Sequence, residues 1–290
     1  MEKINCPICQ SKKINFFCKK NGFKLYNCLP CGLGFVWPTP SKLVDIYQAP
    51  YFKGSFDDSK VDKFGYTDYE EDKKAMRKTF IAYLDKISEL TAGRKIFDVG
   101  AATGYFLDLA KARGWQTAGI EISEYAAKIA GAKGHKIFTG NLADLEINEK
   151  YDAVAMFDVL EHLAEPQKYL LAVSGILNQG GVLAINTIDR SSFYAKLMGK
   201  NWHAIVPPEH LFYYSTESLS TLLKTAGFEV LLRLKIGKKF TLPYIFKVMA
   251  NSYNFKILIK LADIFGKGCW KKIYLPVNLR DNIFIIAKKI

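Results

Sequence analysis

Long apolar runs are missing from this 290-residue sequence. No stretch approaches the roughly 20 apolar residues that a membrane-spanning helix needs. The opening segment, MEKINCPICQ, lacks the apolar core of a secretory leader. We therefore expect a cytoplasmic protein that keeps its six cysteines reduced, not an exported or integral membrane protein.

Acidic residues are scarce near the C-terminus, where residues 231–290 hold thirteen Lys or Arg and only two acids. Residues 61–190 hold sixteen basic and nineteen acidic residues, so the net charge of +13 is unevenly distributed. A protein that grips nucleic acid across its active face more often has a basic core. The charge distribution therefore disfavours nucleic acid as a partner.

A dinucleotide-binding fingerprint is also lacking, although residues 95–121 have the pattern of a nucleotide site. The fingerprint requires a third glycine at position 105, which is Tyr105, and a second at position 102, which is Ala102. What remains is an apolar strand over 95–99, a glycine turn, a helix over 104–113 and a second strand. This pattern favours a nucleotide cofactor other than a nicotinamide.

Two acids flank the glycine turn. Glu121 ends the second strand, where a carboxylate can accept both hydroxyls of a ribose. Asp98 precedes Gly100 by two residues and suits a ligand that carries a positive amino group. Gly100 and Gly104 bracket the turn, so that the backbone can approach a ligand closely. Strand, acid, G-x-x-x-G, helix, strand and acid resemble the cofactor site of class I S-adenosylmethionine-dependent methyltransferases. The family usually has glycine at Ala102, and we expect alanine to be tolerated there.

Four of the six cysteines form two C-x-x-C pairs: Cys6 with Cys9, and Cys28 with Cys31. The gap between the pairs is long enough for a hairpin that brings all four thiolates together. This spacing predicts a structural zinc ribbon with no open coordination position. Its lysine-rich hairpin is either a solvated face or a contact surface for substrate or nucleic acid.

Strands and helices alternate from residue 94 onward, which predicts a parallel sheet covered by helices on both faces. We place further strands over 135–138, 151–157, 181–186, 228–235 and 282–290, and helices over 123–132, 166–178 and 216–226. Phe157 ends the 151–157 strand at the edge of the sheet where ligands bind. Asn141 and Leu142 follow the 135–138 strand and are expected to border an adenine ring.

Three downstream segments sharpen the resemblance: FDVLEH at 157–162, GGVLAINT at 180–187, and PPEHLFYYS at 207–215. They are similar to the subfamily of ubiquinone-type O-methyltransferases and glycan-cluster methyltransferases, and the N-terminal zinc ribbon resembles the sugar-modifying members. The resemblance implies a Rossmann-like seven-stranded α/β sheet and an S-adenosylmethionine pocket. The residues expected in this pocket are Asp98, Gly100, Ala101, Gly104, Glu121, Ile122, Asn141, Leu142 and Phe157.

A hydroxyl acceptor needs a base to take its proton. Among four histidines, we predict His210 or His162 in this role, with His203 third. Two alternatives stay open: His162 caps a helix, and His210 braces its loop through backbone hydrogen bonds. Asp158, Glu161 and His162 are also close enough in sequence for a divalent cation, which the subfamily resemblance implies, or for a helix start with acids at its positive end.

The sequence divides into a zinc ribbon (1–40), a linker, lid and N-terminal helix (41–92), and a methyltransferase domain (93–290) with a helical insertion at 243–270. The lid is the aromatic-rich stretch 51–72. Its Tyr66 and Tyr69 either close over the cofactor or are ordinary packing residues. Residues 243–272 are apolar with interspersed lysines. They form either a cover or homodimer surface, or a peripheral contact with the inner face of a membrane.

The leading functional hypothesis is methyl transfer from S-adenosylmethionine to a hydroxyl of a sugar or surface-glycan intermediate. One alternative is a zinc-ribbon RNA methyltransferase. Enzymes that methylate exocyclic amines have an N/D-P-P-Y/F signature after the corresponding strand, and this signature is absent after residues 151–157. The other is a non-catalytic scaffold with a degenerate cofactor domain.

Overall fold

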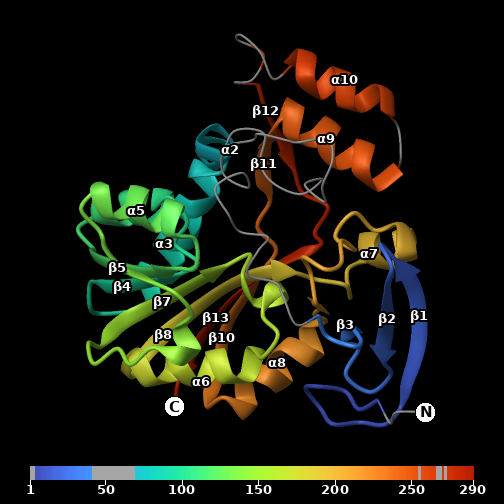
Figure 1. The fold of residues 1–290 in the computed structure, drawn as a ribbon. Coiled ribbons are helices and arrows are strands. Elements are labelled where there is room, and N and C mark those ends of the chain that lie inside the picture. The colour runs from blue at the N-terminus through green and yellow to red at the C-terminus, as the bar shows by residue number, and fades with distance from the viewer. Residues whose placement is uncertain (1–3, 41–68, 254–255, 266–269, 271–272) are drawn as a thin grey trace.

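The computed structural model describes residues 4–40, 69–253, 256–265, 270 and 273–290 (Figure 1). Its largest element is a seven-stranded sheet in the order β10-β13-β8-β7-β4-β5-β6. Strand β13 runs antiparallel to β8 and β10, and the remaining strands are parallel to one another. The strands are β4 (Lys95–Val99), β5 (Gln116–Glu121), β6 (Lys136–Thr139), β7 (Tyr151–Phe157), β8 (Leu177–Ile188), β10 (Phe228–Leu234) and β13 (Asn282–Lys289). The predicted α/β class with a seven-stranded sheet is therefore confirmed.

Helices cover both faces of this sheet, which explains why its central strands are almost continuously apolar. Alternate residues face opposite ways: Ile96 and Ala153 pack toward one layer, whereas Phe97 and Val154 pack toward the other. Helices α3 and α4 form the first layer, and α6 and α8 lie together on the second (Figure 1). The helices of the domain are α2 (Tyr69–Ala75), α3 (Arg77–Leu90), α4 (Tyr105–Lys111), α5 (Glu124–Ala132), α6 (Pro166–Ile176), α7 (Phe193–Met198) and α8 (Thr216–Thr225), with 3₁₀ turns at Leu142–Asp144, Leu160–His162 and Gly199–Asn201.

The N-terminal ribbon belongs to a second sheet that includes a short strand from the later part of the chain. Its order is β1-β2-β3-β9, with β1 (Ile14–Lys20), β2 (Phe23–Cys28), β3 (Gly34–Val36) and β9 (Phe212–Tyr213). Strand β3 pairs antiparallel with β9, so that Phe35 lies opposite Phe212. The apolar core of the ribbon is continuous with the core beneath α6 and α8. The domain boundary at residue 40 stays a prediction, but these contacts anchor the ribbon to the rest of the chain.

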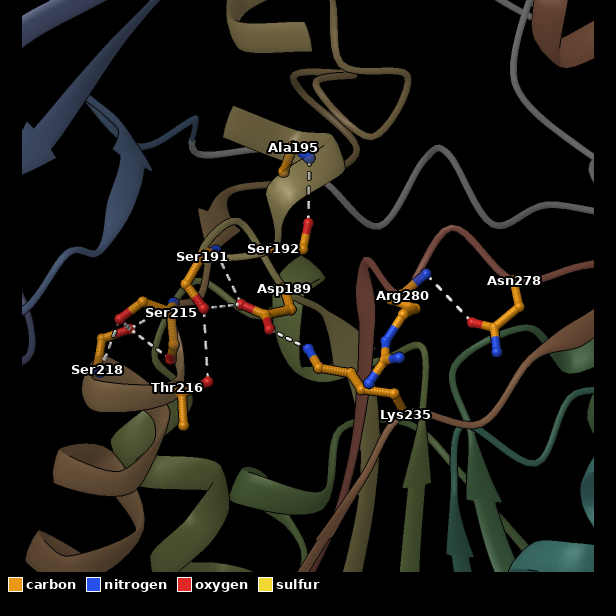
Figure 2. Close-up of polar contacts among 10 residues, drawn as sticks. All are labelled: Asp189, Ser191, Ser192, Ala195, Ser215, Thr216, Ser218, Lys235, Asn278 and Arg280. Atoms are coloured by element: carbon orange, nitrogen blue, oxygen red, sulfur yellow. Dashed lines mark hydrogen bonds and ion pairs between the residues drawn. The ribbon is translucent and has the colours of Figure 1, made fainter. Parts of the chain in front are cut away.

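The loop between β8 and β9 is fixed by polar contacts around Asp189 (Figure 2). The Asp189 carboxylate accepts a hydrogen bond from the Ser191 N–H at 2.8 Å and pairs with the ammonium of Lys235. Downstream, Ser215 and Ser218 exchange side-chain and backbone hydrogen bonds in a capping box that starts α8. The Ser215 hydroxyl also donates to the carbonyl of Cys31 at 2.6 Å. The loop is therefore held between the sheet edge and the ribbon.

The segment between β10 and β13 contains more structure than the predicted helical insertion. Strand β11 (Lys238–Thr241) pairs with β12 (Tyr274–Val277) in a two-stranded sheet, and α9 (Leu242–Tyr253) and α10 (Lys256–Phe265) lie between them in sequence. The β11–β12 pair was not predicted, since four-residue strands with mixed polarity give little periodic signal. Within the described residues, none of the helices combines the length and apolarity needed to cross a bilayer.

The predicted lid lies mostly outside the described residues, including Tyr66. Helix α2 begins at Tyr69, inside the stretch expected to be a loop. The predicted membrane or homodimer surface at 243–272 also lies partly outside the described residues, and both contacts stay predictions.

Candidate functional site

A cavity of about 350 Å³, here called the strand-end cavity, opens at the carboxyl ends of β4, β5 and β7. Ligands of open α/β sheets bind at this edge. Eight of the nine predicted cofactor residues line the cavity: Asp98, Gly100, Ala101, Glu121, Ile122, Asn141, Leu142 and Phe157. The ninth, Gly104, is the N-cap of α4 at the end of the same turn.

The turn between β4 and α4 requires a left-handed backbone three times. Gly100 and Gly104 have φ angles of +79° and +82°, and Ala102 has a φ of +49°. A Cβ on Gly100 would lie 2.7 Å from a methyl carbon of Val159, which is shorter than real contacts allow. Glycine would fit position 102 better than alanine, because alanine costs about 1–2 kcal/mol in this region.

Replacing Ala102 by glycine is expected to raise the free energy of unfolding by about 0.5–1 kcal/mol, since the relief of left-handed strain exceeds the added freedom of the unfolded chain. The matched control is Ala101→Gly, one position earlier and outside the positive-φ residues, which should lose stability. Urea denaturation of both variants measures the difference. Equal destabilisation by the two substitutions would show that Ala102 carries no strain.

Glu121 braces the same turn from the end of β5. One of its carboxylate oxygens accepts the Ala102 N–H at 2.8 Å, and the other accepts the Ser123 N–H at 2.9 Å. Burial raises the pKa of Glu121, while these two backbone hydrogen bonds oppose the rise. The carboxylate thus shapes the turn and also lines the cavity.

Asp98 and Lys73 form the second charged part of the cavity. Burial raises the pKa of Asp98 well above its ordinary value, the Glu121 charge raises it further, and the Lys73 ammonium opposes both. Lys73, on α2, is itself buried, with its ammonium 5.1 Å from the Tyr69 ring centre and 5.8 Å from that of Phe80. Lys73 could not be predicted from sequence, because the run EEDKKAMRK is typical of a solvated charged stretch.

An aromatic wall surrounds the end of β7. The Phe157 ring lies 4.9 Å from the Phe106 ring at 85° and 6.1 Å from the Phe80 ring. Phe80, Tyr105 and Phe106 also line the strand-end cavity. Aromatic faces attract cations, so this wall suits a ligand with positive charge.

The two predicted bases lie next to each other, with ring centres 4.8 Å apart. His162 lines the strand-end cavity, whereas His210 lies behind it and is not among the lining residues. His162 Nδ1 donates to the Glu209 carbonyl and His210 Nδ1 to the Ala204 carbonyl, both at 2.8 Å. A carbonyl only accepts, so each neutral ring keeps the lone pair on Nε2. Both histidines therefore brace the 204–210 loop, and each could also act as a base through Nε2.

One cluster beside the cavity could hold a cation. Ligand atoms of Glu161, His162 and His210 lie within 4.8 Å of one another. Burial and the nearby Asp158 charge raise the pKa of Glu161 to about 8, and Thr187 donates to its carboxylate at 2.7 Å. Asp158 belongs instead to an ion pair with Lys238, at 2.8 Å and 2.9 Å. The structure thus brings His210 to this cluster, where the sequence had pointed to Asp158.

The four ribbon cysteines converge on one point. Sulfur atoms of Cys6 and Cys31 are 3.6 Å apart, those of Cys9 and Cys28 are 3.4 Å apart, and all four lie within 4.8 Å of one another. Tetrahedral zinc with bonds of about 2.3 Å separates its sulfur ligands by about 3.8 Å. The donor set and its spacing therefore fit a zinc ion.

Both cysteine pairs adopt the same turn. The residue after each pair, Gln10 or Gly32, has a positive φ, and its N–H donates to the carbonyl of Cys6 or Cys28, respectively, at 3.0 Å. Cys18 lies in β1 and is outside the four-cysteine cluster. The repeated turn aims all four side chains inward, as closed metal sites require.

Comparisons with known proteins find relatives of this chain. The sequence pattern of the methyltransferase domain family matches residues 72–232. A Mycolicibacterium smegmatis protein named probable S-adenosylmethionine-dependent methyltransferase is 28% identical over 148 residues, covering 50% of this chain and 56% of that protein. A ubiquinone biosynthesis O-methyltransferase of Nitrosomonas europaea is 25% identical over 161 residues, covering 50% of this chain and 68% of that protein. The chain thus spans little more than half the length of the first relative.

Among solved structures, the YcgJ protein of Bacillus subtilis has a similar fold. Its TM-score is 0.50 at 13% sequence identity, and the match covers 73% of this chain and 98% of that protein. The family match begins at residue 72 and so does not reach the four ribbon cysteines.

Proposed function

This chain belongs to the methyltransferase domain family, and from that premise we propose that it transfers a methyl group from S-adenosylmethionine to a hydroxyl of a sugar or surface-glycan intermediate. The observation that carries the proposal is the strand-end cavity, which combines the buried acids Asp98 and Glu121 with an aromatic wall. The acceptor class is supported by the resemblance of a zinc ribbon before such a domain to sugar-modifying methyltransferases.

The residues of the cavity fit the parts of this cofactor. Glu121 is proposed to accept the ribose hydroxyls, and Asp98 to face the amino group. Asn141 and Leu142 are proposed to border the adenine. Leu142 is almost fully buried, and the side-chain Oδ1 of Asn141 accepts a hydrogen bond from the Ala143 N–H. Phe157 and its aromatic neighbours suit the positive sulfur.

S-adenosylmethionine supplies a methyl carbon on a positively charged sulfur, which leaves as a neutral thioether when the acceptor oxygen bonds to that carbon. The protein must hold the hydroxyl in line and take up its proton. We propose His162 as the base, because it lines the cavity and keeps its lone pair on Nε2. Burial lowers the pKa of His210 well below its ordinary value, and His162 lowers it further, so His210 stays neutral behind it.

The function is tested by titrating S-adenosylhomocysteine calorimetrically and then screening nucleotide-activated sugars for a methyl mass increment. Saturable binding and a methylated sugar are expected. Failure to bind would overturn the enzymatic proposal and favour the scaffold. Methylation of RNA but of no sugar would overturn the acceptor class.

His162→Asn is expected to lower kcat by roughly 100-fold or more on the acceptor found, because general-base catalysis contributes about 10²–10⁴. Asparagine can still donate to the Glu209 carbonyl, so the loop should keep its place. His135→Asn is the control, since His135 does not line this cavity and contacts Thr117 and Asp108 instead. The proposed base is wrong if His162→Asn retains kcat while His210→Asn loses it.

The four ribbon cysteines are proposed to bind structural zinc. All four positions of a tetrahedral ion are then filled by protein, so the ion has no part in methyl transfer.

A further inference from the structure

A second cavity of about 290 Å³, here called the hairpin cavity, lies between α9 and the β11–β12 pair. Helix α9 contributes Tyr244, Ile245, Val248 and Met249, a spacing that places them on one helical face. Ile236 and Phe240 continue the apolar wall from β11 and the residues before it, and the Phe240 and Tyr244 rings stack at 5.1 Å and 12°.

Polar side chains also line the hairpin cavity. Lys238, His203 and Asp281 line it. The buried Asp281 carboxylate accepts a hydrogen bond from the Trp202 indole at 2.8 Å and lies 3.6 Å from His203 Nε2. The cavity therefore combines polar groups with the apolar wall of α9.

An ion pair joins the walls of the two cavities. Lys238 lines the hairpin cavity and contacts Asp158, which lines the strand-end cavity. Although burial raises the pKa of Asp158, Lys238 and Lys73 together hold it below its ordinary value, so the pair is charged. The polar groups of the hairpin cavity thus adjoin the place where β7 ends.

The walls of the two cavities are also tied together through helix α2 and helix α3. Thr241 of β11 donates to the Asp72 carboxylate at 2.5 Å, and Thr79 of α3 donates to the Gly237 carbonyl at 3.0 Å. Helix α2 carries Tyr69 and Lys73, which line the strand-end cavity. The hairpin is therefore fixed against the wall of the strand-end cavity.

We infer that the hairpin cavity is the acceptor site, and that it takes an amphipathic acceptor whose hydroxyl-bearing head is attached to an apolar aglycone. The inference rests on the proposed methyl transfer and narrows the class of molecule that accepts the methyl group. A bare sugar would leave the apolar wall of α9 in contact with water, whereas an alkyl or aryl aglycone covers it. The head then lies at His203 and Lys238, beside the cofactor.

The test measures glycoside binding to the protein saturated with S-adenosylhomocysteine. The probes are n-octyl β-D-glucoside below its micelle concentration, phenyl β-D-glucoside and methyl β-D-glucoside. The octyl or the phenyl compound is expected to bind at least about tenfold more tightly than the methyl compound, because it buries apolar area. If the octyl compound binds more tightly than the phenyl compound, the aglycone is chain-like; the reverse order indicates an aromatic aglycone.

Three variants locate the binding. Val248→Trp fills the cavity and should erase the preference, and Val248→Ala enlarges it and should shift the preference toward decyl glucoside. Leu275→Trp is the matched control, because Leu275 is 40% exposed on β12 and does not line the cavity. Calorimetry with S-adenosylhomocysteine confirms that each variant is folded.

The outcomes separate the two proposals. Retained S-adenosylhomocysteine binding with no preference among the glucosides, or with a preference that Val248→Trp leaves intact, overturns the acceptor site while methyl transfer stands. If the unsubstituted protein does not bind S-adenosylhomocysteine at all, the proposed function itself is overturned.

Discussion

Glu121→Ala is expected to weaken S-adenosylhomocysteine binding by at least about 100-fold, because two charge-assisted hydrogen bonds to the ribose are each worth roughly 1.5–3 kcal/mol. The substitution also removes the acceptor of the Ala102 and Ser123 N–H groups. Those buried donors would then lack a partner, and the turn that approaches the cofactor would lose its brace. Titration calorimetry measures the affinity, and urea denaturation measures the accompanying loss of stability.

Glu124→Ala is the matched control, since Glu124 is an exposed acid in the first turn of α5. It should leave the affinity unchanged within about twofold, as expected for a solvated charge. A Glu121→Ala protein that binds as tightly as the Glu124→Ala protein would remove Glu121 from the cofactor site. Weaker binding in both would point to the net charge of the cavity instead.

Cys28→Ser is expected to abolish zinc binding and unfold the ribbon. Apparent zinc-binding free energies are about 10–16 kcal/mol in small zinc domains, so losing the ion removes most of the stability of such a unit. Elemental analysis should find about one zinc per chain before the substitution and almost none after it. Limited proteolysis should then cut the segment that holds β1 and β2.

The same variant should also slow methyl transfer, although no zinc ligand touches the reacting atoms. Strand β9 pairs with β3 and follows the loop that carries His210, so an unfolded ribbon frees that loop. A fall in kcat of at least about tenfold is expected, since small misplacements of catalytic groups cost rates of this order. Cys18→Ser is the control, because Cys18 is buried in the same ribbon but lies outside the zinc cluster. Zinc retained by Cys28→Ser and lost by Cys18→Ser would refute the assigned ligand set.

The parts of the molecule that were predictable are those that local pattern determines. The alternation of strands and helices, the turn between Gly100 and Gly104, and the paired C-x-x-C turns are each contained within about 30 residues. Parallel strands also bring their carboxyl ends to one edge, so Asp98, Glu121 and Phe157 could be placed together in advance.

The features that were not predicted depend on strands that pair across a long stretch of sequence, or on lysine side chains that are buried. Strand β9 has only two residues, and its sequence does not predict that it pairs with a strand near residue 35. Lys73 and Lys238 look like ordinary solvated lysines, yet each is only 8% exposed and faces carboxylates. A lysine can be buried where the fold brings acids beside it. Most of those acids are distant in sequence, so the burial is visible only in the tertiary structure.

The β3–β9 pairing also sets an order of events during synthesis. The two strands are about 180 positions apart along the chain, so their pairing closes a long loop and is slow relative to local folding. The ribbon residues leave the ribosome before residues 212 and 213, so β3 must wait for its partner strand β9 to emerge. During that interval Phe35 and Val36 have no partner strand on one side, and the growing chain carries an open sheet edge.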